Sequence, residues 1–368
     1  MGCDLLVVGA SFAGLACARA AALAGLQVTV LEKKATAGEK LHTTGIIVKD
    51  AVDSIEWLTE VPSHFVRRIE AVRLYAPNLR HVDLQAPGYY FLATDTASLL
   101  NWMADSVRRL GVQVRLSTLF ENARQKGRIW EVPLSTGEVL TASYLVGADG
   151  PHSRVAKALG LSCNEHFLFG IEHEYGKAHL QENLLHCFIT RQLAPGYIGW
   201  ALAGVGATQI GLARRMPSDA RTPGSRQLAI NTFLEKISAF IQPADSPLSV
   251  RAGMIPCGGV LKKVAKAGVL LVGDAAGMVS PVTAGGIHTA LHHGAQAGEG
   301  VAAFLSGKSE DPAHCLVRQY PHFRSKRVLR WLFDHLQSDW MFNHLLSTTP
   351  MRRAAELIYF HRKGAGRP

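Results

Sequence analysis

Three short glycine-containing segments carry residue types that suit phosphates and ribose hydroxyls. The first is GASFAG, residues 9–14, between an apolar run and an alanine-rich run. Gly9 permits a tight turn, and Gly14 permits close packing of a helix on a strand. Ser11 stands at the middle position, where a small residue lets the backbone approach a pyrophosphate. Its hydroxyl can itself donate to a phosphate oxygen, and the following helix turns its positive end toward the anion.

Glu32 completes the first segment. It ends an apolar stretch, residues 26–32, which we expect to be a strand after a helix over residues 13–24. A carboxylate at this place accepts from a ribose hydroxyl and repels a 2′-phosphate, which disfavours NADP as the ligand. Strand, turn, helix, strand and acid make a βαβ unit. A glycine-rich turn in an α/β protein without a nucleotide has the same local pattern, so that alternative stays open.

The other two segments follow apolar strands. In GADGPHSR, residues 147–154, Asp149 can orient water and amides around a pyrophosphate, or simply cap the next helix. In GDAAGMVSPVTAGGI, residues 273–287, Asp274 can accept from a ribityl hydroxyl, and Pro281 can pack flat against a ring system. The helix that opens after Gly285–Gly286 presents backbone N–H groups that suit a flavin carbonyl.

The elements that must position these segments alternate between two patterns. Parallel-type βα segments are interrupted by antiparallel blocks, so we expect one domain written in pieces around an inserted, sheet-rich one. GVGATQ, residues 204–209, lacks a following helix and acid and is predicted to be a hairpin turn. We expect further strands at 3–8, 69–94 and 267–273, a loop at 35–50, and helices at 97–110, 225–240, 286–305 and within 311–362.

Taken together, the segments resemble the FAD-dependent oxidoreductases of the para-hydroxybenzoate-hydroxylase-like superfamily, nearest the geranylgeranyl reductase branch. APGYIGWALAGVGATQIGLA, residues 194–213, resembles that branch's P-G-x-x-G-W strand and the x-x-G-L strand after it. GEKLHTTGI, residues 38–46, lies where the branch has G-x-K-x-C-G-G. The chain departs from the pattern at Ser11, at His42–Thr43 in place of Cys-Gly, and at Thr96, which stands in the place of an arginine.

The resemblance implies an α/β FAD-binding Rossmann-like domain of glutathione-reductase type, an inserted antiparallel-sheet α+β substrate domain and a helical C-terminus. The FAD-binding domain would comprise residues 1–68, 95–165 and 266–305. The substrate (cap) domain would comprise residues 69–94 and 166–265, and the C-terminal helical region residues 306–368.

The resemblance also implies non-covalent FAD, with NAD(P)H or another reductant as a transient electron donor. Catalytic candidates are His42, His288 and Trp200, although an ordinary structural role fits each of them equally well. No metal site is expected. The residues expected to bind FAD are Gly9, Ser11, Ala13, Gly14, Glu32, Lys33, Lys40, Asp149, Gly150, Asp274, Pro281, Gly285, Gly286 and Ile287.

The implied activity is reduction of C=C bonds in an apolar, isoprenoid-like substrate by hydride from reduced FAD. One alternative is a monooxygenase that uses NAD(P)H and O₂ on an aromatic or apolar substrate. Another, from a different class, is a prenyl-binding escort protein without redox activity. Retention of Glu32, Asp149 and Asp274 argues against the escort, and the halogenase signature Trp-x-Trp-x-Ile-Pro is absent.

Composition limits the partners. The chain has 368 residues, 48% of them hydrophobic, and a net charge of +10, but no basic run interleaved with aromatics. We therefore expect no nucleic-acid partner and a basic surface around an anionic cofactor. Six cysteines without C-x-x-C spacing are expected to be reduced thiols in the core. With no leader and no spanning segment in the sequence, a cytoplasmic location is expected, and peripheral contact at the inner membrane face stays open.

Overall fold

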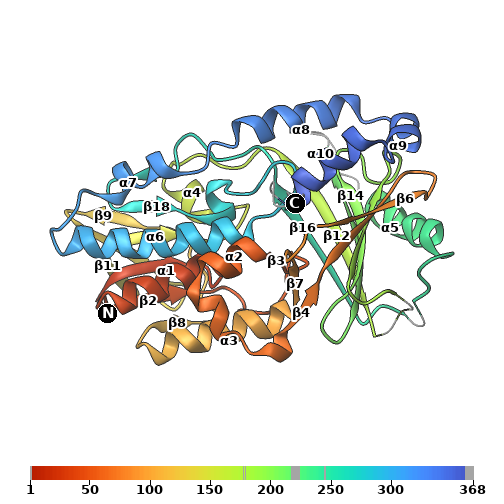
Figure 1. The fold of residues 1–368 in the computed structure, drawn as a ribbon. Coiled ribbons are helices and arrows are strands. Elements are labelled where there is room, and N and C mark those ends of the chain that lie inside the picture. The colour runs from red at the N-terminus through yellow and green to blue at the C-terminus, as the bar shows by residue number, and fades with distance from the viewer. Residues whose placement is uncertain (1, 177, 179, 217–223, 244–245, 361–368) are drawn as a thin grey trace. The chain divides into compact units, whose positions relative to one another are not determined.

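The computed structural model describes residues 2–176, 178, 180–216, 224–243 and 246–360 (Figure 1). The chain divides into two compact units, and each is assembled from three separate stretches of sequence. Unit 1 comprises Met1–Lys40, Ala97–Glu165 and Ile255–Arg324. Unit 2 comprises Leu41–Thr96, His166–Met254 and Ser325–Pro368.

Unit 1 is built on an eight-stranded sheet in the order β17-β18-β11-β1-β2-β8, with β10 and β9 added beside β11. The strands from β18 to β8 run parallel, and β1 is buried between β2 and β11. Its strands are β1 (Gly2–Val8), β2 (Val28–Leu31), β8 (Gln113–Arg115), β9 (Arg124–Lys126), β10 (Ile129–Pro133), β11 (Val139–Gly147), β17 (Ala265–Lys266) and β18 (Val269–Leu271). Its helices are α1 (Phe12–Leu23), α3 (Thr96–Arg109), α4 (Arg154–Ala158), α6 (Ile287–Leu305) and α7 (Pro312–Cys315).

Small residues bring helices α1 and α6 into close contact. A Cβ atom on Gly294 would lie 2.3 Å from the carbonyl oxygen of Ala13, and one on Gly298 would lie 2.2 Å from that of Cys17. Only glycine allows the two backbones to approach this closely. Because α1 follows β1 and α6 follows β18, this packing sets the two helices side by side next to the parallel sheet.

Unit 2 contains a seven-stranded sheet in the order β16-β12-β15-β14-β13-β5-β6 and a three-stranded sheet in the order β3-β7-β4. A core rich in aromatic side chains packs beneath the larger sheet. Its strands are β3 (Ile46–Val48), β4 (Val66–Ile69), β5 (Ala71–Tyr75), β6 (His81–Gln85), β7 (Phe91–Thr94), β12 (Phe167–Tyr175), β13 (Leu184–Ile189), β14 (Ile198–Ala203), β15 (Thr208–Arg215) and β16 (Ser249–Pro256). Its helices are α2 (Lys49–Ser54), α5 (Gly224–Ile237), α8 (Arg324–Leu336), α9 (Asp339–Leu345) and α10 (Thr349–Phe360).

Most elements expected from periodicity are confirmed. Helices α1, α3, α5 and α6 lie where they were predicted, and residues 204–207 form the turn between antiparallel strands β14 and β15. The loop expected at 35–50 contains β3 and the start of α2. Residues 41–68 belong to unit 2 rather than to the predicted FAD-binding domain, because β3 and β4 both pair with β7.

Two further observations concern the predicted cysteines and membrane segments. Cys17, Cys187 and Cys257 are buried, but Cys163 is exposed, so the expectation that all six lie in the core is wrong. Across the described residues, no helix combines the length and the hydropathy that a bilayer crossing requires.

Candidate functional site

The turn between β1 and α1 has no room for side chains at two positions. Gly9 has a φ of +105°, and a Cβ atom there would lie 2.4 Å from the carbonyl oxygen of Ala148. A Cβ atom on Gly14 would lie 2.0 Å from the carbonyl oxygen of Gly9. Both glycines are therefore required by the backbone itself, and they hold the start of α1 against the ends of β1 and β11.

Ser11 caps helix α1. Its Oγ accepts from the backbone N–H of Gly14 at 3.3 Å and donates to the carbonyl oxygen of Ala148 at 2.9 Å. The hydroxyl has one proton, and here the carbonyl accepts it. Ser11 thereby ties the turn to Ala148, just after β11, and its donation to a phosphate stays a prediction. Ala13 lies in the first turn of α1 and is buried, with its backbone against Gly294 of α6.

Glu32 is buried at the end of β2 and is tied to the same turn. Its Oε2 accepts from the backbone N–H of Ala10 at 2.8 Å, and its Oε1 accepts from that of Lys34 at 3.0 Å. Each carboxylate oxygen can accept a second hydrogen bond, so a ligand hydroxyl can still be bound. Beside it lies an open hollow whose lining includes the exposed Lys33 and Lys40.

Asp149 acts as a helix cap. Its Oδ2 accepts from the backbone N–H groups of Arg154 and Val155 at 2.7 and 3.1 Å, and its Oδ1 accepts from the Ser153 hydroxyl at 2.6 Å. Burial raises the pKa of this carboxyl group, while these donors oppose the shift. The capping role, one of the two alternatives for GADGPHSR, is thus the one that the geometry displays. Gly150, with a φ of +84°, makes the turn.

Asp274 is different, because within the described part of the chain no protein group donates to its carboxylate. It lies in a short 3₁₀ turn, Gly273–Ala276, after β18. Asn164 fixes this turn by donating to the carbonyl oxygens of Asp274 and Pro151 at 2.9 and 3.1 Å. Burial raises the pKa of the Asp274 carboxyl to about 6. A hydrogen-bond acceptor without a protein donor in such a place fits a ligand hydroxyl.

Helix α6 begins beside Asp274 without a side-chain cap. Its N-cap residue is Gly286, and a Cβ atom there would lie 3.4 Å from Asp274 Oδ1. The preceding turn is tight, with Ala284 at a φ of +51° and Gly285 exposed. The first turn, from Ile287 onward, offers backbone N–H groups and the positive end of the helix dipole to an electron-rich group. Pro281, in the turn before it, is buried.

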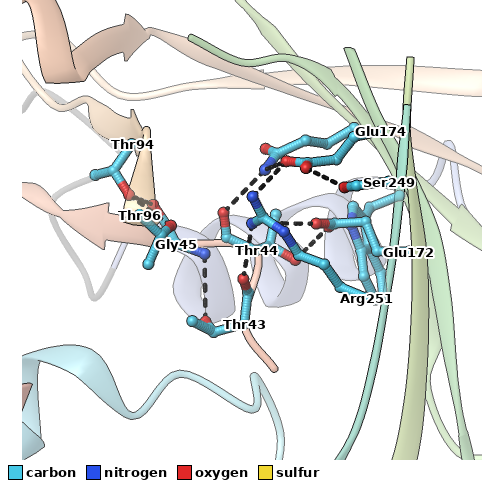
Figure 2. A network of polar contacts seen from close by, with 11 residues as sticks. Thr43, Thr44, Gly45, Thr94, Thr96, Glu172, Glu174, Ser249 and Arg251 are labelled. Carbon is cyan, nitrogen blue, oxygen red and sulfur yellow. Dashed lines mark hydrogen bonds and ion pairs between the residues drawn. The ribbon is translucent and has the colours of Figure 1, made fainter. Parts of the chain in front are cut away.

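A separate polar network in unit 2 holds the loop before β3 (Figure 2). Glu172 is buried in β12, and its Oε2 accepts from Thr44 Oγ1 and from Trp200 Nε1, both at 2.7 Å. Glu172, Gly211 and Trp200 are cross-strand neighbours on β12, β15 and β14. A Cβ atom on Gly211 would lie 2.6 Å from the indole ring, so the glycine is what lets Trp200 reach across to Glu172.

Arg251 joins this carboxylate to a second one, as Figure 2 shows. Its guanidinium lies 2.5 Å from Glu174 and 3.8 Å from Glu172 Oε1, and it donates to the carbonyl oxygen of Thr43 at 3.3 Å. Ser249 also donates to Glu174, at 2.5 Å. Burial raises the pKa of Glu172, opposed by its hydrogen bonds and by Arg251. The network therefore fixes the backbone of the Thr43–Gly45 loop from β12 and β16.

Sequence analysis missed this network. The signal was a pair of acids two residues apart, Glu172 and Glu174, within the buried strand β12, where both side chains must lie on one face of the sheet. Thr96, noted as an arginine replacement, is fully buried and bonds Thr94, which donates to the carbonyl oxygen of Gly45. It therefore supports the other end of the same loop.

The three catalytic candidates lie in different units. His288 is in the first turn of α6 in unit 1. In unit 2, the His42 Nδ1 lies 2.6 Å from the carbonyl oxygen of Ala252, and Trp200 is engaged by Glu172. Each thus has a structural partner or position, and a shared role for them in catalysis stays a prediction.

The sequence model of the FAD-binding domain family matches residues 2–331. The chain belongs to that family. The acceptors and close-approach glycines of unit 1 fit such a cofactor, because Asp274 has no donor among the described residues and α6 begins without a side-chain cap. FAD as the cofactor, predicted from the sequence, is confirmed.

Curated relatives include reductases of archaeal lipids. The chain is 28% identical over 341 residues to digeranylgeranylglycerophospholipid reductase 2 of Methanopyrus kandleri, covering 86% of this chain and 81% of the relative. It is 27% identical over 353 residues to digeranylgeranylglycerophospholipid reductase of Methanocaldococcus jannaschii, covering 91% and 85%. Family and relatives together identify an FAD-dependent oxidoreductase, as expected.

Solved structures share the fold. A geranylgeranyl bacteriochlorophyll reductase-like protein of Thermoplasma acidophilum superposes with a TM-score of 0.84 at 17% identity, covering 98% of this chain and 97% of that one. The p-nitrophenol 4-monooxygenase of Pseudomonas putida superposes with a TM-score of 0.69 at 16% identity, covering all of both chains. The predicted FAD-binding α/β fold is thereby confirmed.

Proposed function

We propose that this flavoprotein reduces carbon–carbon double bonds of an apolar, isoprenoid-like substrate. The observation that carries the proposal is the similarity to digeranylgeranylglycerophospholipid reductases over more than four-fifths of the chain and of those relatives. Those reductases are named for a lipid with prenyl chains. A substrate of the same chemical class is therefore proposed for this chain.

Unit 1 binds the cofactor in this proposal, through Gly9, Ser11, Ala13, Gly14 and the acceptors Glu32 and Asp274. Lys33, Lys40, Asp149, Gly150, Pro281 and Gly285–Ile287 complete the proposed contacts. Bound, reduced FAD supplies the hydride that such a reaction requires. The α6 N-terminus stabilises negative charge on an adjacent electron-rich ring through its N–H groups and dipole.

Unit 2 provides the substrate domain in this proposal. In its larger sheet, β5 pairs with β13 in parallel, whereas β12 with β15, β13 with β14, β14 with β15 and β5 with β6 pair antiparallel. This sheet carries the Glu172–Arg251 network, which holds the Thr43–Gly45 loop. Hydride addition to one carbon requires a proton at the other. His42 and His288 are the candidate donors, with Trp200 as a ring that can contact the substrate.

The remaining partners are also proposals. NAD(P)H or another reductant binds transiently to reduce a non-covalent FAD. The protein is cytoplasmic and contacts the inner face of the membrane peripherally, because long prenyl chains reside in lipid. The net charge of +10 favours an anionic lipid surface.

The test is product analysis under anaerobic conditions. Detergent-dispersed geranylgeranyl glycerolipid is incubated with the holoprotein and dithionite or NAD(P)H, and mass spectrometry counts added hydrogens. We expect two hydrogens per double bond, and far less product with Asp274→Asn at the same FAD concentration. Unchanged lipid in every condition would overturn the proposal. Insertion of an oxygen atom only when O₂ is admitted would establish the monooxygenase alternative, which the fold similarity to p-nitrophenol 4-monooxygenase favours.

A further inference from the structure

Helix α8 buries polar side chains and leaves most of its apolar side chains exposed, apart from Phe333, which is partly buried against the core. The residues buried on its inner side are Arg330, 6% exposed, and Gln337 just after its end, 5% exposed. Its outer side carries Trp331 at 57%, Leu336 at 60% and Val328 at 61% exposure. A surface helix in a water-soluble domain normally turns its apolar side chains inward.

Inward hydrogen bonds fix this orientation. Arg330 donates to the carbonyl oxygen of Gly196 and to Asp334, one helical turn further along. Gln337 Oε1 accepts from the backbone N–H of Gly196 at 2.8 Å. Rotating α8 to bury its apolar side would leave a guanidinium without its acceptors, so the exposed face is built into the fold.

Helix α9 repeats a motif found on α8. Trp331 stacks on His335, and Trp340 lies against His344 in a tilted arrangement, in each case with ring centroids 4.7 Å apart. In both pairs the histidine Nδ1 lies 2.8 Å from the tryptophan carbonyl oxygen. These rings are held in place, yet they are exposed to solvent; the exposed fraction of Trp340 is 67%. Indoles with one apolar body and one polar N–H are enriched where membrane meets water.

Exposed apolar side chains are concentrated here rather than spread over the surface. In the described part of the chain, fifteen large hydrophobic residues are exposed, and eight of them lie between residues 328 and 357. The charges beside them are mainly positive: Lys326 and Arg327 precede the stripe on α8, and Arg353 lies on α10. Asp334 is already paired with Arg330. An apolar stripe bordered by bases complements an anionic lipid surface.

We propose that the α8–α9 face docks on the surface of an anionic bilayer, with its apolar side chains and both indoles entering the headgroup region. We define the α8–α9 face as Val328, Leu329, Trp331, Leu332, Leu336, Trp340 and Leu345. The inference deepens the proposed function, since a prenyl-lipid substrate would be taken from that bilayer, and it assigns the membrane contact to one side of unit 2.

The test measures co-sedimentation of the holoprotein with vesicles. Leu336→Glu is compared with Leu23→Glu, because both leucines end a helix and their exposures, 60% and 59%, match. With vesicles of phosphatidylglycerol and phosphatidylcholine at low salt, we expect wild type and Leu23→Glu to bind alike. We expect Leu336→Glu to bind about tenfold more weakly or worse, and pure phosphatidylcholine to retain little protein. Equal binding of the two variants would overturn the proposal, as would no binding of wild type.

Two further readouts separate the alternatives. Brominated lipids should quench wild-type tryptophan fluorescence more than that of the Trp331→Ser, Trp340→Ser double variant. If sizing instead shows a dimer that Leu336→Glu dissociates, and no vesicle binding, the face joins two copies of the chain and the proposal is wrong. Turnover of detergent-dispersed lipid is expected to be the same in Leu336→Glu and wild type, so failure of docking and failure of the reductase function remain distinguishable.

Discussion

Two carboxylates, the partly exposed Asp274 of unit 1 and Glu174 of unit 2, have opposite surroundings. In unit 1, Asp274 faces no protein donor among the described residues, and the adjacent helix α6 has no side-chain cap. In unit 2, Glu174 is bonded by Arg251, Ser249 and Gln209. The first arrangement costs stability and leaves acceptor and donor groups for a ligand. In the second arrangement the polar groups bond one another and hold the Thr43–Gly45 loop in place.

This difference distinguishes polar groups that remain available to a ligand from polar groups that support the fold. Asp274 is partly exposed, no described neighbour donates to its carboxylate, and its pKa is raised, so it is a candidate to accept from an external partner. A saturated carboxylate such as Glu174 is evidence of support. Glu172 lies between these extremes, with Oε2 saturated and Oε1 without a hydrogen bond in the described structure.

The largest effect should follow from breaking the network of unit 2. Arg251→Met leaves Glu172 and Glu174 facing each other without a cation, and we expect a loss of about 3–5 kcal/mol in unfolding free energy at pH 7. Arg73→Met, which breaks an exposed pair with Asp83, is the control and should cost under about 1 kcal/mol. Urea unfolding of the wild type and the two variants measures both losses; similar losses for both variants would refute the scaffolding role.

The turn from Gly9 to Gly14 should be the next most sensitive position. Gly9→Ala combines a positive φ with a clash against a carbonyl oxygen, so we expect about 3 kcal/mol of destabilisation and loss of bound FAD. Gly25→Ala is the control, because its φ of +89° is similar but nothing lies within 4 Å of the new Cβ atom. Flavin absorbance after gel filtration distinguishes them. Retention of FAD by Gly9→Ala would show that the close approach is not required.

Asp274→Asn should stabilise the FAD-free protein, whereas Arg251→Met and Gly9→Ala destabilise it. Burial raises the pKa of this carboxyl from 3.8 to about 6 in the folded state. The native protein therefore binds more protons, and its stability falls as pH rises through that window. Removing the charge should stabilise the FAD-free protein at pH 7 by at most about 3 kcal/mol and weaken FAD binding.

Melting temperatures of the FAD-free protein between pH 4 and 8, with a FAD titration, provide the check. Asp105→Asn on the exposed side of α3 is the control and should change neither quantity. Undiminished FAD affinity in Asp274→Asn would contradict the assignment of this carboxylate to the cofactor.

The smallest effect is expected from Trp200→Phe. It removes one of the two donors to Glu172, at a cost of about 1–2 kcal/mol. Burial already raises the pKa of Glu172, so stability contributed by its protonated form is lost as pH rises through the folded pKa. Without the indole N–H the folded pKa should rise further, so this loss should be larger and should extend to higher pH. Trp130→Phe, whose buried N–H has no acceptor in the described structure, should cost stability without changing its pH dependence.

The comparison also explains what the sequence could predict. The turn from Gly9 to Glu32 is local, because its residues lie within one βαβ unit and their spacing dictates their geometry. The unit 2 network joins residues from Thr43 to Arg251 and depends on strand register, with Glu172 opposite Gly211 and Gly211 opposite Trp200. No local pattern specifies that register. The roles of Ser11 and Asp149 were ambiguous for the same reason, since their partners depend on tertiary packing.

The most direct measurement is a single anaerobic turnover. The holoprotein is reduced with dithionite until its flavin absorbance is bleached, freed of excess reductant, and mixed with a dispersed geranylgeranyl lipid. The account predicts that the flavin absorbance returns in step with the appearance of lipid carrying two added hydrogens. Absorbance that stays bleached with the lipid, and returns only when O₂ is admitted, would contradict it.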